Sequence, residues 1–282
     1  MSRQKRVVTS HDISCTGRCS LTVALPILSS VGIETIILPT SILSTHTSGF
    51  VGFTFHDLKD ESRKITKHWE NYPRDIDAVY TGFLGSIEQI EILDEYISTK
   101  KSDTYIVVDP AMGDNGALYA IFDNSYAMEM TKLCQKANLV IPNVTEACFM
   151  TNTPYLGTKQ TKEQIEQLLD KLNDLGINEI VLTSVRLEEN KIGTATRIKG
   201  FETIYSMNEE IQGYFHGTGD VFGSALVGLV VNGKSLAKAA ESAANFVINA
   251  IKKTVSMDDF DPKYGVNFEL VLKDLINEVE NK

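Results

Sequence analysis

Short apolar runs alternate with longer amphipathic stretches along most of the chain. The short runs are rich in Val and Ile and are bounded by polar or turn residues, so we expect buried strands at residues 7–9, 35–39, 78–81, 105–109, 139–142 and 180–183. The longer stretches carry apolar residues three and four positions apart, which predicts helices at residues 20–31, 86–98, 124–137 and 162–175. This alternation of strand and helix indicates a parallel sheet covered by helices on both faces.

The pattern changes after residue 184. Residues 192–198 and 202–207 flank Lys199-Gly200 and predict an antiparallel hairpin, and helices are expected at residues 218–231, 236–253 and 268–279. No internal repeat or long linker interrupts the chain, so we expect one domain over residues 1–282. The predicted fold class is a three-layer α/β/α sandwich with a mostly parallel central sheet and an antiparallel edge hairpin.

The net charge and the hydropathy of the chain argue against some classes of binding partner. With 37 acidic and 27 basic residues the chain has a net charge of −10, which disfavours nucleic acids and anionic membrane surfaces as partners. The longest apolar run, residues 222–231, is too short to cross a bilayer, and residues 1–12 lack the apolar segment of a signal peptide. We therefore expect a cytoplasmic protein that binds neither nucleic acid nor membranes. Its four cysteines form no metal-binding pattern and are expected as reduced thiols.

The segment His216-Gly217-Thr218-Gly219-Asp220 opens the predicted helix at residues 218–231. Glycines let a ligand approach the backbone, and the free N–H groups of a helix start, together with the helix dipole, favour an anion such as a phosphate. Asp220 has two interpretations: a carboxylate that stabilises the first helical turn, or a base that accepts a proton from a hydroxyl attacking a bound phosphate. The spacing alone leaves both open.

Residues 228–235, Gly-Leu-Val-Val-Asn-Gly-Lys-Ser, match the letters of a P-loop. A P-loop follows a strand and wraps phosphates with small residues, whereas residues 229–231 continue the apolar face of the preceding helix. We interpret residues 232–233 as the end of that helix and Ser235 as the cap of the next one. This context argues against a P-loop nucleoside triphosphatase.

Oxygen-bearing side chains follow two successive predicted strands. Asp109 ends one strand and Asp114 lies five residues further on, in a loop shaped by proline and glycine, while Asn143 and Glu146 follow the next strand. Asn143 and Glu146 fit a capping box at the start of a helix. Oxygen ligands at the carboxyl edge of parallel strands also suit Mg²⁺ bound to phosphates. Both interpretations stay open, and the letters alone favour the capping box.

Three further segments complete a distinctive set of motifs: residues 81–86 (Thr-Gly-Phe-Leu-Gly-Ser), residues 109–116 (Asp-Pro-Ala-Met-Gly-Asp-Asn-Gly) and His46-Thr47. Together with Gly217 to Asp220 and the Asn143-x-x-Glu146 motif, they resemble the ribokinase-like superfamily in its vitamin-kinase branch. Within that branch the resemblance is greatest to pyridoxal kinases, and it covers nearly the whole chain.

The resemblance implies transfer of the ATP γ-phosphate to the 5′-hydroxyl of pyridoxal, pyridoxine or pyridoxamine. Asp220 would be the base, and the N–H groups of Gly217, Thr218 and Gly219 would hold the charge of the phosphoryl group. Contacts to ATP are implied for Asp109, Asp114, Asn143, Glu146, Thr183 and Ser184. Of these residues Asp109 and Glu146 would hold Mg²⁺. A monovalent cation such as K⁺ and a homodimeric assembly are also implied.

The resemblance further implies that Ser10, His46, Thr47 and Phe83 line the pocket for the vitamin ring. Many pyridoxal kinases carry tyrosine where this chain has Phe83, so the preferred vitamer stays open. Residues 12–18 and 121–125 are expected as flexible cover over the site. Two alternatives remain: a hydroxymethylpyrimidine kinase of thiamine synthesis with the same fold and base, and a non-catalytic vitamin-binding protein.

Overall fold

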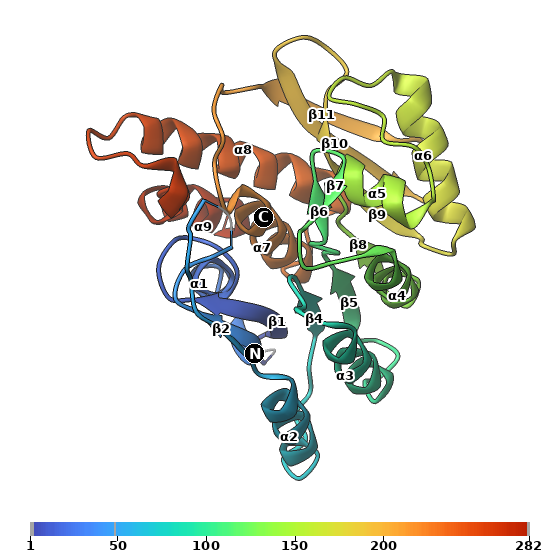
Figure 1. Cartoon of the computed structure of the whole chain (residues 1–282), viewed down its shortest axis with the longest axis vertical. Helices are drawn as coiled ribbons and strands as arrows, with labels where there is room; N and C mark the ends of the chain where they lie inside the picture. Colours follow the sequence, from blue (N-terminus) through green and yellow to red (C-terminus); the bar gives the residue numbers. More distant parts are fainter. Residues whose placement is uncertain (1–2, 48, 281–282) are drawn as a thin grey trace.

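The middle layer of the protein is a nine-stranded sheet with the strand order β11-β10-β9-β8-β5-β4-β1-β2-β3 (Figure 1). The structure is a computed structural model that describes residues 3–47 and 49–280. The strands of this sheet are β1 (Arg6–Ser14), β2 (Glu34–Leu43), β3 (Phe55–Asp57), β4 (Ala78–Thr81), β5 (Tyr105–Val108), β8 (Leu139–Val140), β9 (Glu179–Val185), β10 (Lys191–Ile198) and β11 (Ile204–Glu209). The strands from β9 to β2 pair in parallel, whereas β10 and β11 at one edge and β3 at the other pair antiparallel. A separate ribbon is formed by β6 (Gly113–Asp114) and β7 (Ala117–Leu118).

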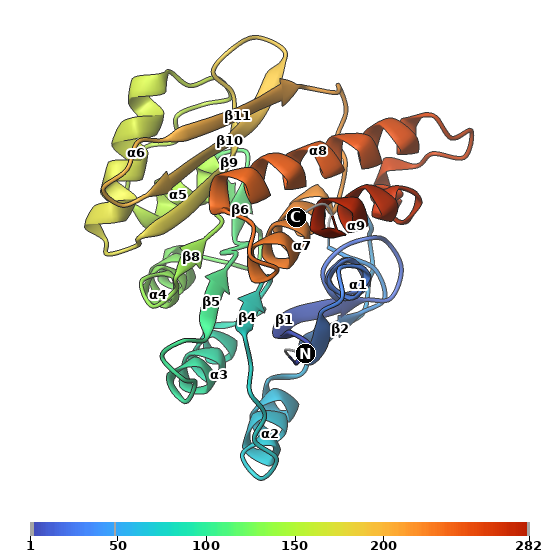
Figure 2. The same ribbon diagram turned by 180° about the vertical axis from the view of Figure 1, so that it is seen from behind.

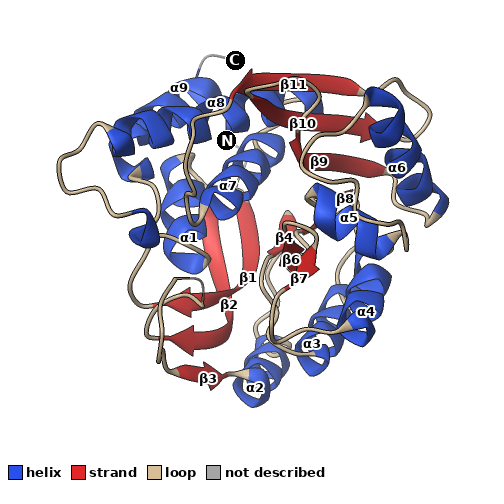
Figure 3. Ribbon diagram, turned by 45° about the horizontal axis from the view of Figure 1, so that its top comes forward, coloured by secondary structure: helices blue, strands red, loops and turns tan. Residues whose placement is uncertain are grey.

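Helices cover both faces of the sheet (Figures 1 and 2). One layer contains α1 (Leu21–Ser30), α7 (Thr218–Val231), α8 (Leu236–Val255) and α9 (Leu272–Glu280), preceded by the 3₁₀ turns η1 (Pro262–Tyr264) and η2 (Phe268–Val271). The other contains α2 (Lys59–Trp69), α3 (Ile87–Ser98), α4 (Asn124–Cys134), α5 (Val144–Met150) and α6 (Lys162–Asp174). The secondary-structure colouring of Figure 3 shows the strands between these two sets of helices.

The sequence of the strands explains why both faces are covered. Successive residues of a strand point to opposite faces, and here both are apolar: Val7 and Val107 belong to the hydrophobic core under α1, α7 and α8, whereas Val8 and Val108 belong to the core under α3 to α6. All four are fully buried. The predicted three-layer α/β/α sandwich is confirmed.

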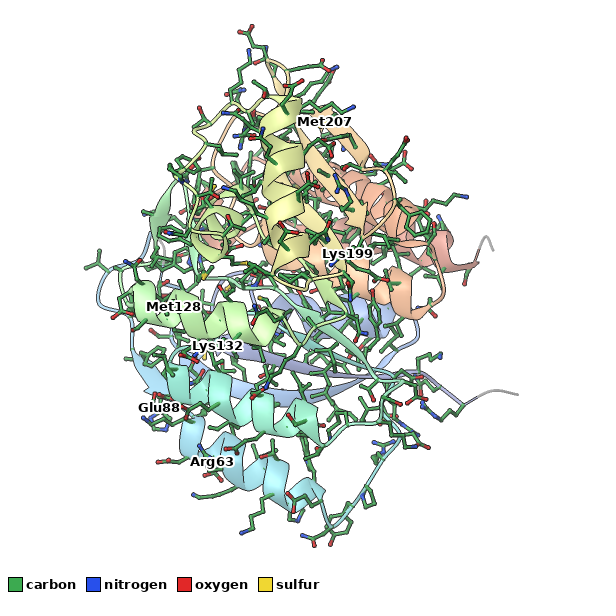
Figure 4. All side chains as sticks on the ribbon, turned by 90° about the vertical axis from the view of Figure 1, so that its right-hand side faces the viewer. Arg63, Glu88, Met128, Lys132, Lys199 and Met207 are labelled. Carbon is green, nitrogen blue, oxygen red and sulfur yellow. The ribbon has the colours of Figure 1, made fainter. Side chains whose placement is uncertain are left out.

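The structure departs from the predicted elements mainly at one edge of the sheet. No strand or helix was predicted at residues 57–61, but Asp57 ends β3, and Asp60 and Glu61 lie in the first turn of α2. There a negative charge stabilises the helix dipole. The outer sides of α2, α3 and α4 carry exposed side chains, among them Arg63, Glu88, Met128 and Lys132 (labelled in Figure 4). Because α2 buries so little of itself, its sequence carries no clear apolar stripe.

Three smaller expectations can be compared with the structure. The letters of the P-loop lie at the end of α7 and in the turn before α8, so the structure supports the interpretation as a helix end; Ser235 occupies the cap position of α8 without a side-chain capping bond. All four cysteines are free thiols. In the described part of the chain we find no helix with the length and apolar character needed to span a bilayer.

Candidate functional site

A cavity of about 490 Å³ lies at the carboxyl ends of the parallel strands. This is the edge at which open α/β sheets bind ligands. The structure brings almost all of the predicted site residues to this cavity: its lining includes His46, Thr47, Phe83, Asp109, Asp114, Asn143, Glu146, Thr183, Ser184, Gly217, Thr218, Gly219 and Asp220. Ser10 is the exception, because it is 2% exposed within β1 and is not among the lining residues.

The start of α7 forms one wall of the cavity. Gly217 is the N-cap residue and adopts a left-handed conformation with φ of 72°, which glycine tolerates best. The first hydrogen bond of the helix runs from the N–H of Val221 to the carbonyl oxygen of Gly217 (2.9 Å). The N–H groups of Thr218, Gly219 and Asp220 therefore have no acceptor within the helix, and together with the helix dipole they form an anion-binding surface.

Asp220 lies in the first turn of α7, beside these N–H groups. Burial and the negative charge of Asp12 raise the pKa of its carboxyl to about 7, although the backbone N–H of Ser20 favours the ionised form. A carboxylate with this pKa can take up a proton near neutral pH, as a general base must. The geometry therefore places a proton acceptor next to an anion-binding surface.

Asp109 and Glu146 form an acidic pair that also lines the cavity, and a Cβ atom on Gly223 of α7 would lie 3.7 Å from Asp109 Oδ2. Burial, the charge of Glu146 and the charge of Asp220 raise the pKa of Asp109 well above its usual range. The N–H of Ala111 donates to Asp109 Oδ1 (3.1 Å), which shapes the loop that follows β5. Burial also raises the pKa of Glu146, to about 7.

Glu146 and Asn143 form the capping box that the letters favoured. The N–H of Glu146 donates to Asn143 Oδ1 (3.0 Å), and the N–H of Asn143 donates to Glu146 Oε2 (2.8 Å). The other carboxylate oxygen of Glu146 accepts the N–H of Met112 (3.0 Å), while the Asn143 side chain donates to the carbonyl oxygen of Gly113 (2.8 Å). The capping box thus ties the loop after β5 to the start of α5 and fixes Asp109 in place.

The carboxylate oxygens of Asp109 and Glu146 are suitable ligands for a divalent cation. No cluster of three or more His, Cys, Asp or Glu side chains that could hold a metal occurs within residues 3–47 and 49–280. Two buried carboxylates nonetheless repel each other, which a cation between them would relieve. Mg²⁺ is typically bound by one or two carboxylates together with phosphate oxygens and water, so a site of this kind does not need a third protein carboxylate.

The side of the cavity near α8 was not identified from the sequence. Its lining includes the apolar side chains of Ala244, Val247, Ile248 and Ile251 on α8 and of Phe215 before α7. Nearby, Arg186 and Glu210 form an ion pair (2.7 Å). The sequence predicted a helix at residues 236–253, but packing of α8 against β10 and β11 determines which of its residues reach the cavity. This apolar surface can hold a flat ring.

The opposite end of the cavity contains the connection between β1 and α1, which was also missed. Asp12, Ser14, Cys19 and Ser20 line the cavity here. Residues 12–18 were expected as flexible cover, but β1 continues through Asp12 to Ser14, and Asp12 is only 4% exposed. Close by, His46 Nε2 is 2.6 Å from the carbonyl oxygen of Lys263.

Comparisons with known proteins identify the family and support the fold of the chain. The model of the phosphomethylpyrimidine kinase family matches residues 28–263. A Bacteroides thetaiotaomicron protein provisionally assigned as a phosphomethylpyrimidine kinase, crystallised with pyridoxal, is 37% identical with a TM-score of 0.91, over 97% of this chain and 96% of that one. The pyridoxal kinase of Lactobacillus plantarum is 30% identical with a TM-score of 0.90, over 99% of each chain.

A third relative is the hydroxymethylpyrimidine/phosphomethylpyrimidine kinase of Bacillus subtilis, which is 28% identical over 64% of this chain and 65% of its own length. The matches to the first curated relatives span 65–66% of the length of those proteins. The relatives therefore include proteins named for two different substrate rings, pyridine and pyrimidine.

Proposed function

The chain belongs to the phosphomethylpyrimidine kinase family, and we propose that it transfers the γ-phosphate of ATP to the 5′-hydroxyl of pyridoxal, pyridoxine or pyridoxamine. The observation that carries the proposal is the position of Asp220 in one cavity with the free N–H groups at the start of α7. A proton acceptor and an anion-binding surface are the two components that transfer of a phosphoryl group to a hydroxyl requires.

The reaction follows from this arrangement. Asp220 accepts the proton of the 5′-hydroxyl as the hydroxyl oxygen forms a bond to the γ-phosphorus, and the bond from that phosphorus to the β,γ-bridging oxygen breaks, which releases ADP. The N–H groups of Gly217, Thr218 and Gly219 stabilise the charge on the equatorial phosphoryl oxygens. These donors are fixed before the substrate binds, so they need no reorganisation during the reaction.

ATP is proposed to lie along the cavity from α7 to α8. The apolar side chains of α8 would contact the adenine ring, and Thr183 and Ser184 at the end of β9 would contact the nucleotide beside them. Asp109 and Glu146 would hold Mg²⁺, with Asp114 and Asn143 next to them, and the ion would neutralise charge on the phosphates. Glu146 already accepts three backbone N–H groups and Asp109 accepts one, so the Asp109 carboxylate has more lone pairs free to bind the ion.

The vitamin ring is proposed to lie at the end of the cavity near β1 and β2. His46, Thr47 and Phe83 line the cavity there, and they offer an imidazole, a hydroxyl and a phenyl ring. Ser10 has no surface on the cavity, so a contact with the ring would require movement of β1.

We also propose that residues 1–282 act as one kinase domain. Both hydrophobic cores pack on the same nine-stranded sheet, and the cavity takes residues from both ends of the chain. Separation of the chain into two parts would divide the site.

A hydroxymethylpyrimidine kinase is the second candidate function. The Bacillus subtilis relative and the name of the family favour it. The two functions share base, anion-binding surface and nucleotide, and they differ only in the ring that carries the hydroxyl. Phosphate transfer from Mg-ATP should be measured in parallel for pyridoxal, pyridoxine, pyridoxamine and hydroxymethylpyrimidine. Turnover of a vitamer supports the first function, and turnover of the pyrimidine alone supports the second. Absence of turnover with all four would support a vitamin-binding protein.

A further inference from the structure

The carboxyl end of β1 carries a buried carboxylate beside the proposed base. Asp12 is 4% exposed, and it lies where the register between β1 and β2 shifts, between His11 and Ile13. A β-bulge of this kind redirects a side chain, and bulges are frequent next to active sites. Here it accompanies an acidic side chain that lines the same cavity as Asp220.

Both carboxylate oxygens of Asp12 accept a hydrogen bond from a serine. The Ser20 hydroxyl donates to Oδ1 (2.5 Å), and the Ser14 hydroxyl donates to Oδ2 (3.0 Å). Hydrogen bonds from hydroxyls to a buried carboxylate are short and strong. Asp12 is therefore held in one orientation, and it holds Ser20 in return.

Ser20 has an unusual backbone conformation. Its φ is 53° and its ψ is −132°, a combination that is sterically unfavourable for a residue with a side chain. Ser20 is also the N-cap of α1, and its carbonyl oxygen accepts the N–H groups of Val23 and Ala24. In this conformation the N–H of Ser20 faces the carboxylate of Asp220 and stabilises its ionised form. A strained backbone that presents its N–H to the carboxylate of Asp220 indicates that this conformation serves a function.

The loop around Ser20 also contacts the N-cap of α7. A Cβ atom on Gly217 would lie 1.9 Å from the carbonyl oxygen of Arg18. The N–H of Arg18 in turn donates to the carbonyl oxygen of Tyr264 (3.0 Å), which anchors the loop from behind. The position of the β1–α1 connection and the position of the anion-binding N–H groups are thus linked by direct contact.

Asp12 and Asp220 also interact through their charges. The thiol of Cys19 faces both carboxylates, and burial with these two charges raises its pKa, so it stays neutral. Tyr80, Asp109 and Tyr119 also face Asp220. On the other side His46 faces Asp12 and favours its ionised form.

We propose that Asp12 is a positioning residue, which through the Ser20 hydroxyl holds the Ser20 N–H against the carboxylate of Asp220. The inference rests on the proposed function, because it takes Asp220 as the base. Asp12 orients the base toward the acceptor hydroxyl, so its loss affects turnover more than binding of ATP.

Three variants separate the contributions of Asp12. Asp12→Ala removes both hydrogen bonds and the charge. Asp12→Asn keeps the shape and an oxygen that can accept from Ser20. Ser20→Gly keeps the backbone conformation, which glycine adopts without strain, but removes the hydroxyl that joins Asp12 to the loop. Ser30→Ala is the matched control, because Ser30 lies at the far end of α1 and its hydroxyl donates only to the carbonyl oxygen of Ile27 (2.7 Å).

Phosphate transfer to the best acceptor should be measured for each variant, with thermal unfolding as the check of folding. We expect Asp12→Ala and Ser20→Gly to lower kcat about 10-fold or more while the KM for ATP changes less than about twofold. Asp12→Asn should keep most of the wild-type kcat. In a plot of kcat against pH, its acid limb should lie at lower pH than that of the wild-type protein, because the like charge beside Asp220 is gone. Ser30→Ala should match the wild-type protein.

The outcomes distinguish this inference from the proposed function. An active Asp220→Asn variant would contradict the base on which both depend. If Asp220→Asn is inactive but Ser20→Gly and a folded Asp12→Ala keep wild-type kcat, the positioning role of Asp12 is wrong and the proposed function stands. If Asp12→Ala does not fold, Ser20→Gly and Asp12→Asn carry the test, since neither adds strain or volume; wild-type kcat in Ser20→Gly with an unshifted acid limb in Asp12→Asn would overturn the inference.

Discussion

The backbone of Gly217 lies so close to that of Arg18 that a Cβ atom on Gly217 would come within 1.9 Å of the Arg18 carbonyl oxygen. The N-cap of α7 and the connection after β1 can meet in this way only because residue 217 is glycine. The contact joins the anion-binding surface, which lies near the end of the chain, to a loop near its beginning.

Gly217→Ala should destabilise the protein by about 3 kcal/mol, because the new Cβ would clash with Arg18 in a backbone conformation that alanine avoids. Gly219→Ala is the matched variant. Gly219 is helical and no heavy atom lies within 4 Å of its added Cβ, so stability should rise by about 0.5 kcal/mol. Urea unfolding measures both changes. Equal stability of the two variants would show that the contact with Arg18 is not tight in solution.

Activity should depend on pH through Asp220. The base must be ionised to accept a proton, and burial raises its pKa to about 7, so kcat/KM for the acceptor should fall as the pH drops below about 7. His216 does not explain such a fall in kcat/KM near pH 7, because burial and the neighbouring His46 lower the pKa of His216 to about 4. A pH profile of initial rates provides the measurement. A profile that stays flat down to pH 5 would contradict a base with a raised pKa.

The same raised pKa predicts an effect on stability. A buried carboxyl whose pKa is raised from 3.8 to about 7 in the folded state stabilises the fold only while it is protonated, and this stability is lost as the pH rises toward 7. Asp220→Asn should therefore be more stable than the wild-type protein at pH 8, by about 2 kcal/mol once contact with solvent in the cavity is allowed for. The difference should be smaller at pH 5. A variant less stable than wild type at pH 8 would show that Asp220 is not desolvated.

Glu146→Gln should weaken both the fold and the response to Mg²⁺. Each oxygen of Glu146 accepts a backbone N–H, but a glutamine amide has one oxygen and would turn an NH₂ group toward the other donor. We expect a loss of about 1–2 kcal/mol of stability from this mismatch. The concentration of Mg²⁺ needed for half-maximal rate should also increase, because one of the two carboxylates near the phosphates is lost. An unchanged Mg²⁺ titration would remove Glu146 from the metal site.

The sequence predicted the fold and most of the site for one physical reason. Strands buried on both faces have nearly continuous apolar runs, so β1, β4 and β5 could be located, and the rule that ligands bind at the carboxyl ends of parallel strands then selected Asp109 and Asn143. The start of α7 at Thr218 coincides with the predicted helix start, because glycines and an acidic first turn mark it in the sequence.

The residues that were missed depend on contacts between distant segments. Asp12 lies beyond the predicted strand at residues 7–9 and belongs to no motif, and only the irregular pairing of β1 with β2 and the proximity of α7 show that it reaches Asp220. Which face of α8 lines the cavity is likewise decided by its packing against β10 and β11. Helix α2 was missed because it buries so little: among its described residues only Ser62 is buried.

The most direct test of Asp220 as the base of a pyridoxal kinase is single-turnover phosphate transfer from Mg-ATP to pyridoxal by the wild-type protein and by Asp220→Asn. We expect a phosphorylated 5′-hydroxyl with the wild-type protein and a rate at least about 10²-fold lower with the variant, while calorimetry shows ATP binding in both. Transfer at near wild-type rate by Asp220→Asn would contradict the role of Asp220 as the base.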